Sequence, residues 1–256
     1  MKYVILLCDG MSDEVLEALD GKTPLGAAKT SHMDTLARMS EIGMVHTIPK
    51  GLSPDCDTAN LSLLGYDASK DVALLNKDFE GGVDDFYTKT GKKGAVITKD
   101  ENLKNLASNI NMKTIDIDSN ESGSTNYSGK KDAVVSAIFE EDVDVVLVHV
   151  KSPYEASVAG DTEKKIKAIE NIDAYIIGPL VEEIQGRDAE FRLLIMPYFP
   201  TYLRLGTSAS DAVPYMLYDS TLEVENNTVY NEKTAREASN YFDEGYELLN
   251  HFLELD

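Results

Sequence analysis

Met1-Lys2-Tyr3-Val4-Ile5-Leu6-Leu7-Cys8-Asp9-Gly10 opens the chain, and this stretch decides the fold. Every residue from Tyr3 to Cys8 is apolar or aromatic. A run this short and continuous is typical of a strand covered on both faces, and we expect it at the centre of a parallel sheet. Ligands of open α/β sheets bind beyond the carboxyl ends of the strands, so Asp9 is expected where chemistry takes place. The alternative is that Asp9 only opens a turn or caps a helix.

Apolar and amphipathic stretches alternate along the rest of the chain. Apolar runs predict strands at 44–48, 94–98, 114–117, 143–150, 191–196 and 212–218. Pro214 places the last of these toward an edge or a bulge. Helices are predicted at 32–42, 58–65, 101–108, 131–140, 160–185 and from about 234 to 253, the last with a break near 243–245. Strands separated by helices throughout predict a three-layer α/β/α sandwich with a mostly parallel central sheet.

Composition narrows the class of protein. The 256 residues fit one large α/β domain, and two cysteines without a disulfide framework favour a reduced, cytoplasmic protein. The opening apolar run is too short to span a bilayer and lacks a small-residue cleavage site, so no leader is expected. The net charge is −21, with 45 acids against 24 bases and no basic stripe, so neither nucleic acid nor membrane is an expected partner.

A helix that begins near Cys56 is the second candidate for chemistry. The first turn of a helix offers free N–H groups and a positive dipole end, which can depress the pKa of a thiol and make it reactive. The alternative is that Asp57 or Thr58 only caps the helix and Cys56 is a small buried residue.

The chain contains several short sequence motifs that together indicate one family. They are Lys2 to Met11, Gly21 to Leu25, Ala27 to Thr30, Met33 to Ala37, Asp57 to Asp67, Lys92 to Ile97 and Lys165 to Asp173. Together they resemble the archaeal-type, cofactor-independent phosphoglycerate mutases of the alkaline phosphatase superfamily. This resemblance implies a serine nucleophile that takes the phosphoryl group of 3-phosphoglycerate and two Mn, Zn or Mg ions that stabilise the transfer. It also implies a cap domain inserted after the nucleophile helix.

The resemblance assigns seven positions to the metal ligands and the nucleophile, and only Asp9 is kept. Asp57 and Asn60 belong to the phrase after the nucleophile, whose serine is replaced by Cys56. The ligand positions hold Tyr154, Val158, Tyr198, Phe199 and Ser208. Tyrosine, valine and phenylalanine are bulky or apolar groups that we expect to fill the space of the ions, so no metal cofactor is expected.

The remaining ionisable groups do not rebuild a metal site. The acids expected nearby, Asp9, Asp57, Glu155 and Asp161, would repel a phosphate dianion in the absence of metal. The four histidines are scattered, and each is expected at the surface or satisfied in the core; they are His32, His46, His149 and His251.

The cap domain is also expected to be missing. Residues 68–91 stand where family members carry the inserted domain, so residues 1–256 are predicted to form a single cap-less domain with a short connector. Without a cap the substrate would not be positioned for phosphoryl transfer.

These observations favour a pseudoenzyme that binds a small molecule or a protein partner. The first alternative is a metal-independent enzyme that uses Cys56 as its nucleophile, although no nearby histidine base or arginine pair is evident. The second alternative is a residual phosphomutase or phosphatase, of the class that converts 3-phosphoglycerate to 2-phosphoglycerate, with Asp9, Asp57 and one ion.

Overall fold

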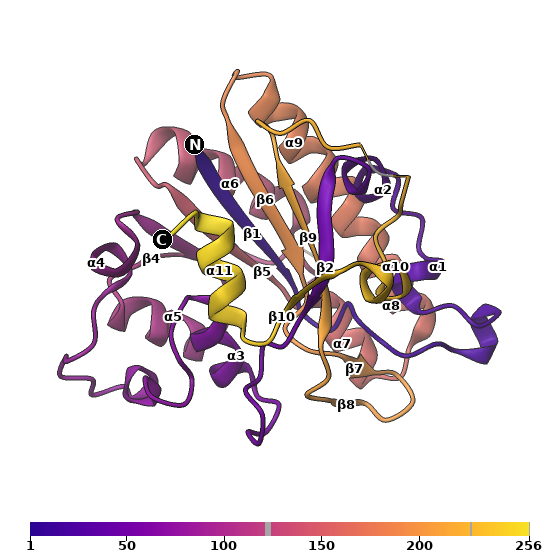
Figure 1. Cartoon of the computed structure of the whole chain (residues 1–256), viewed down its shortest axis with the longest axis horizontal. Coiled ribbons are helices and arrows are strands. Elements are labelled where there is room, and N and C mark those ends of the chain that lie inside the picture. Colours follow the sequence, from indigo (N-terminus) through magenta and orange to yellow (C-terminus); the bar gives the residue numbers. More distant parts are fainter. Residues whose placement is uncertain (121–123, 226, 256) are drawn as a thin grey trace.

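A computed structural model describes residues 1–120, 124–225 and 227–255. Its centre is an eight-stranded sheet (Figure 1). The strand order is β10 (Asn240–Phe242), β2 (Ser40–Val45), β9 (Val213–Asp219), β6 (Phe191–Met196), β1 (Lys2–Cys8), β5 (Val145–Val150), β3 (Gly94–Ile97), β4 (Lys113–Ile115). β9 pairs antiparallel with both of its neighbours, and the other pairings of this sheet are parallel. The predicted three-layer, mostly parallel α/β architecture is confirmed.

β1 occupies the middle of the sheet, as its sequence predicts. It pairs in parallel with β5 on one side, where Leu7 faces His149, and with β6 on the other. From Tyr3 to Cys8 the strand is buried. Burial of each such large apolar side chain contributes roughly 1.5–3 kcal/mol. The central position brings the carboxyl end of β1, and with it Asp9, to the middle of one sheet edge.

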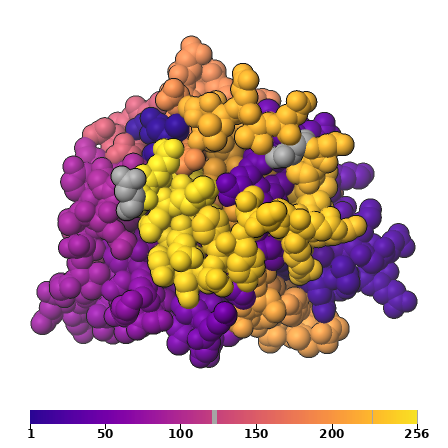
Figure 2. Space-filling model, in the orientation of Figure 1, coloured from indigo at the N-terminus to yellow at the C-terminus, as the bar shows by residue number. Residues whose placement is uncertain are grey.

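Side chains of β1 alternate between two hydrophobic cores. Val4 and Leu6 belong to one core, and Ile5 and Leu7 to the other. The helical segments of the first core are α1 (Pro24–Ala27), α2 (Ser31–Ala37), α6 (Tyr127–Glu140), α8 (Thr162–Ile172), the π-helix η3 (Asp173–Ile177), α9 (Gly178–Gln185) and α10 (Glu232–Glu237). Those of the second are α3 (Cys56–Leu63), the 3-10 helix η2 (Val72–Leu75), α4 (Phe86–Thr90), α5 (Glu101–Asn109) and α11 (Gly245–Leu253). The C-terminal segment that ends in α11 lies across the face seen in Figure 2.

Four shorter elements complete the described chain. They are the 3-10 helix η1 (Glu17–Leu19), α7 (Ser152–Val158), and β7 (Thr201–Tyr202) with β8 (Thr207–Ser208), which form a separate two-stranded antiparallel sheet. Within residues 68–91 the structure has only η2 and α4, joined by irregular chain. In the part of the chain that the structure describes, no helix is long and apolar enough to cross a membrane.

The long helix predicted at 160–185 is continuous but not uniform. α8 passes into the π-helix η3, and α9 follows directly. Pro179 lies in the first turn of α9. Proline has no N–H and clashes with the carbonyl four residues before it, so the preceding turn widens to the π form.

The end predicted for the helix at 32–42 is wrong. α2 ends at Ala37, and Ser40 already starts β2, with its hydroxyl donating to the Leu36 carbonyl oxygen at 2.7 Å. Gly43 does not stop a helix but lies within β2, where a Cβ would come within 2.4 Å of the Asn240 carbonyl oxygen. The glycine therefore permits the close approach of β10.

The placement of β9 at an edge is also wrong, because β9 lies between β2 and β6. Pro214 pairs with Met44 of β2, but the pairing of β9 with β6 runs only from Met216 to Asp219. The missing N–H of Pro214 therefore falls beyond the ladder with β6, where proline is tolerated.

Candidate functional site

Asp9 and His149 meet at the carboxyl edge of the sheet. Asp9 follows β1, His149 lies in β5, and both are buried. The Asp9 Oδ2 atom lies 3.6 Å from His149 Nε2, and among the described residues neither of these atoms, nor Asp9 Oδ1, has a hydrogen-bond partner. The other ring nitrogen, Nδ1, lies 3.1 Å from the Thr98 hydroxyl. Buried polar atoms without partners are rare in native proteins, which makes this pair the least satisfied place in the core.

Tyr198 closes this centre on one side. It is fully buried, and its hydroxyl donates a short hydrogen bond to Asn60 Oδ1 of α3. Its ring stands edge-on to that of His149, with 5.3 Å between centroids, and stacks on Phe199 at 5.9 Å. Burial, and then the negative charge of Asp9, raise the pKa of Tyr198 well above its ordinary value, so the phenol is a neutral donor. Two of the residues at ligand positions, Tyr198 and Phe199, are thus buried and packed beside His149.

The other replacements do not fill the centre. Val158 lies at the end of α7 with 51% of its surface exposed. Tyr154 is half-buried, and its backbone packs so closely on Gly10 that a Cβ at residue 10 would come within 2.4 Å of it. Ser208, in β8, lies 3.4 Å from the Thr201 hydroxyl. The expectation that all the bulky replacements occupy the metal space is therefore wrong for Val158, because α7 carries that side chain to solvent.

Cys56 begins α3, but its thiol is not activated. The helix cap is Asp55, which accepts from the Thr58 N–H at 2.8 Å, and not Asp57 or Thr58. Burial, and then the charge of Asp9, raise the pKa of Cys56 to about 12 although Lys151 acts in the opposite direction. The amino end of a helix lowers the pKa of a thiol, but here desolvation and the neighbouring Asp9 carboxylate raise it by more.

Asp57 and the two other acids expected nearby also have local roles. Asp57 accepts from the Asn102 amide at 3.1 Å, and its pKa is raised, chiefly by burial. Asp161 caps α8 by accepting from the Lys164 N–H, and Glu155 is exposed on α7.

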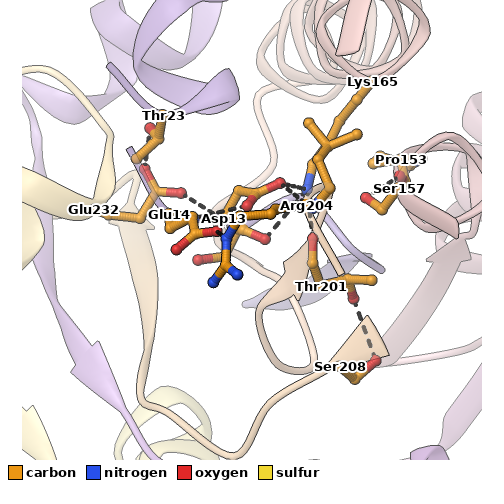
Figure 3. Close-up of polar contacts among 12 residues, drawn as sticks. Asp13, Glu14, Thr23, Pro153, Ser157, Lys165, Thr201, Arg204, Ser208 and Glu232 are labelled. Atoms are coloured by element: carbon orange, nitrogen blue, oxygen red, sulfur yellow. Dashed lines mark hydrogen bonds and ion pairs between the residues drawn. The ribbon is translucent and has the colours of Figure 1, made fainter. Parts of the chain in front are cut away.

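A second buried cluster is centred on Asp13, four residues after Asp9 in the chain (Figure 3). The Lys165 ammonium lies 2.6 Å from Asp13 Oδ2 and donates to the Thr201 carbonyl oxygen at 2.9 Å. Asp13 also accepts from the Leu203 N–H at 3.1 Å, and its own N–H donates to Glu232 Oε1. The network joins the end of β1 to α8, β7 and α10, so its role is structural.

A pair of metal ions does not fit these residues. Asp9 and His149 bring two donor side chains together, and the side chains around them are a phenol, a phenyl ring, an amide and the protonated thiol of Cys56. In the described part of the chain no group of three or more His, Cys, Asp or Glu side chains could hold a metal. A structural or catalytic ion normally takes at least three protein ligands.

Two buried polar residues of this region were not identified from the sequence. His149 is expected at the surface or satisfied in the core, yet its Nε2 has no hydrogen-bond partner among the described residues. The register of β5 with β1 brings its ring to Asp9. The sequence feature that could have identified His149 is its position near the end of the predicted buried strand at 143–150. Lys165 falls on the apolar side of its amphipathic helix, in step with Ile169 and Ile172, and this spacing could have indicated a buried cation.

The sheet order, the single reversed strand and the aspartate after the central strand define an α/β protein with an alkaline-phosphatase-like core. A profile of the metalloenzyme superfamily matches residues 1–243, and the chain belongs to that superfamily. The 2,3-bisphosphoglycerate-independent phosphoglycerate mutase of Methanothrix thermoacetophila is 25% identical over 388 aligned positions, which cover 97% of this chain and 98% of the relative. The resemblance to the archaeal-type mutases is thereby confirmed.

Solved structures show the same fold. A protein from Pyrococcus horikoshii superposes with a TM-score of 0.86 at 19% identity, covering 99% of this chain and 96% of that one. The cofactor-independent phosphoglycerate mutase of Thermoplasma acidophilum gives a TM-score of 0.72 at 16% identity, with 100% of both chains covered. The relatives place this chain in a family of the phosphotransferase type.

Proposed function

We propose that this phosphoglycerate-mutase-like protein has lost two-metal phosphotransfer and acts as a pseudoenzyme that binds a small molecule or a protein partner. The observation that carries the proposal is the position of Tyr198. A buried phenol, bonded to Asn60 and packed on His149, stands where the family resemblance places a metal ligand. The donor set that remains around Asp9 is too small for the chemistry of the relatives.

Other parts of the proposal concern organisation and location. Residues 68–91 are proposed to replace the cap, and the alignment of 388 positions against a chain of 256 residues supports this, because long stretches of the relative have no counterpart here. A cytoplasmic location is proposed from the relationship to these mutases and from the two unpaired cysteines, Cys8 and Cys56.

Thermal unfolding of metal-stripped protein, with and without excess Mn²⁺ or Zn²⁺, tests the proposal. A ligand at 100 times its dissociation constant stabilises the folded state by about 2.7 kcal/mol. For a chain of this length that is a midpoint shift of roughly 5–10 °C. We expect no shift that depends on Asp9, and no conversion of 3-phosphoglycerate to 2-phosphoglycerate with either ion. A shift of that size that Asp9→Asn abolishes, accompanied by turnover, would overturn the proposal in favour of a residual phosphomutase.

The structure disfavours the enzyme with Cys56 as its nucleophile, since the pKa of about 12 leaves almost no thiolate at neutral pH. Iodoacetamide at pH 7.5 is expected to alkylate Cys56 in the folded protein far more slowly than in urea-unfolded protein, as read by peptide mass spectrometry. Cys8, fully buried in β1, is the internal control. Rapid alkylation of Cys56 alone would restore the cysteine enzyme as a candidate.

A further inference from the structure

A small pocket opens on the side of His149 that leads toward the sheet edge at β4. Its volume is about 130 Å³, and it lies beyond the carboxyl ends of β3 and β5 and beside the first turn of α6. This is the edge at which α/β proteins bind ligands. The pocket holds a few waters or one small ion, since liquid water takes about 30 Å³ per molecule.

Three lysines line this pocket, in a chain whose net charge is −21. Lys99 follows β3, Lys151 follows β5 and Lys130 lies on α6. The Lys99 ammonium donates to the Ser119 hydroxyl at 3.1 Å, and Lys151 is paired with Asp100 at 3.0 Å. The three lysines come from segments that are far apart in the sequence, and the fold brings their charges together.

Lys130 is the unusual member of the set. Burial, and then the positive charge of Lys99, lower the pKa of Lys130 to about 8, and no carboxylate of the described chain offsets this. The acids Asp118 and Glu155 also line the pocket, but neither forms an ion pair with Lys130 among the described contacts. A half-buried ammonium without a counter-charge is unfavourable unless an anion joins it.

The next residue shows what an ordinary lysine of this helix does. Lys131 lies 2.5 Å from Asp132 and 2.8 Å from Glu183, and these hydrogen bonds raise its pKa. Two adjacent lysines of α6 thus have opposite environments. Of these two lysines, Lys130, which lines the pocket, forms no ion pair within the described part of the chain.

We propose that this pocket binds a tetrahedral oxyanion, a phosphate or sulfate group, between Lys99, Lys130 and Lys151. Hydroxyl groups of Ser119 and Thr125 line the same pocket and can donate to oxygens that point in different directions. Several donors arranged around one small volume suit a tetrahedral anion better than a planar carboxylate. The pocket adjoins the Asp9 centre through His149 and Lys151, but the proposal does not depend on whether that centre is inactive, because anion binding needs no divalent ion.

A larger groove continues from the pocket and allows the anion to be part of an ester. Its volume is about 780 Å³, it shares Thr125 and Glu155 with the pocket, and the rings of Tyr127 and Tyr175 lie along it. A free oxyanion would occupy the pocket alone, whereas a small phosphomonoester would place its organic part in the groove.

Isothermal titration of the metal-free protein with inorganic phosphate, sulfate and glycerol 3-phosphate tests the site. Chloride at equal ionic strength is the reference. We expect saturable binding that weakens by about tenfold or more in Lys130→Met, the loss of one charge-assisted hydrogen bond, and that Lys131→Met leaves unchanged. Glycerol 3-phosphate binding at least as tightly as phosphate identifies an ester as the ligand, and weaker binding identifies the free ion; both support the oxyanion site.

Two results would overturn it. One is heat that chloride reproduces at the same ionic strength, and the other is phosphate affinity that is equal in the wild type and Lys130→Met. If Lys130→Met does not fold, Lys99→Met carries the same test, because Lys99 is exposed and its removal leaves the core intact. Phosphate titration of the metal-free wild type needs neither an added divalent ion nor turnover, so its result is independent of the metal-dependent thermal shift and separates failure here from failure of the proposed function.

Discussion

Asp9 and Asp13 lie four residues apart after β1, and both are fully buried, but their surroundings are opposite. Asp13 has a lysine ammonium at 2.6 Å and accepts a backbone N–H at 3.1 Å. Among the described residues Asp9 has no hydrogen-bond partner for either oxygen, and its Oδ2 lies 3.6 Å from His149 Nε2, which has none there either. In this part of the chain one carboxylate is bonded into the fold, and the other is left without hydrogen-bond partners.

This difference shows which of the two carboxylates contributes to the stability of the fold. A buried charge without a partner costs several kcal/mol, so a group retained for stability acquires partners, as Asp13 has done. Asp9 has not, although it is the one ligand position that the family resemblance leaves unchanged. Under the proposed loss of two-metal phosphotransfer, the Asp9 centre is a place where the fold carries the energetic cost of a buried carboxylate that has no hydrogen-bond partner among the described residues.

The largest effect is expected at Lys165. Lys165→Met leaves the Asp13 carboxylate buried and unpaired, and removal of one partner from a buried pair typically costs about 3–5 kcal/mol. Urea unfolding followed by circular dichroism measures the loss. Lys167→Met, on the exposed side of the same helix, is the control and should change stability little. Equal effects of the two variants would show that the Asp13 network does not stabilise the fold.

Tyr198→Phe comes second. The variant keeps the ring that fills the centre but removes the donor to Asn60, whose buried oxygen is then unsatisfied, and we expect a loss of about 1–3 kcal/mol. Tyr202→Phe removes an exposed hydroxyl bonded to Asp211 and serves as the control in the same urea experiment. A neutral Tyr198→Phe would mean that water reaches Asn60 and that the centre is less closed than its contacts indicate.

Asp9→Asn is expected to act in the opposite direction. A neutral amide avoids the burial of an unpartnered carboxylate and can donate toward His149, so stability should rise by about 1 kcal/mol. Asp13→Asn should lower it, because Lys165 then loses its counter-charge. Paired thermal melts of the two variants measure both signs. Destabilisation by both substitutions would remove the contrast and indicate that Asp9 has a partner in solution.

The smallest effect is expected at Glu232, whose carboxylate accepts a hydrogen bond from the Asp13 N–H. Burial raises the pKa of Glu232 above its ordinary value of 4.5, although Thr23, backbone N–H groups and Lys165 counteract it. The stability contributed by a group with a raised carboxyl pKa is complete below pH 4.5 and is lost as the pH rises through the folded-state pKa. Wild type should therefore lose stability relative to Glu232→Gln across that range. Glu237→Gln, exposed on the same helix, should show no such trend.

Local patterns were sufficient for most of the fold. The continuous apolar run at 3–8 identified the central strand, and the strand–helix alternation identified the layers, because burial on one or both faces leaves a periodic signature in the chain. The family phrases also located Asp9, Cys56 and the replaced ligand positions, since these depend only on identity along the sequence. The end of α2 was missed because Gly43 reads as a helix stop until β10 is seen to pack against it.

The sequence by itself determined the fold class and the family. Only the tertiary structure decided which polar groups are satisfied. Lys165 lies 152 residues from Asp13, and Thr98 lies 51 residues from His149, so their pairing depends on strand order and helix placement, not on spacing. The same holds for the lysine pocket beside His149, whose charges come from three elements. A hydrogen bond or an ion pair requires contact within a few ångströms, and in this chain the folded sheet supplies that contact.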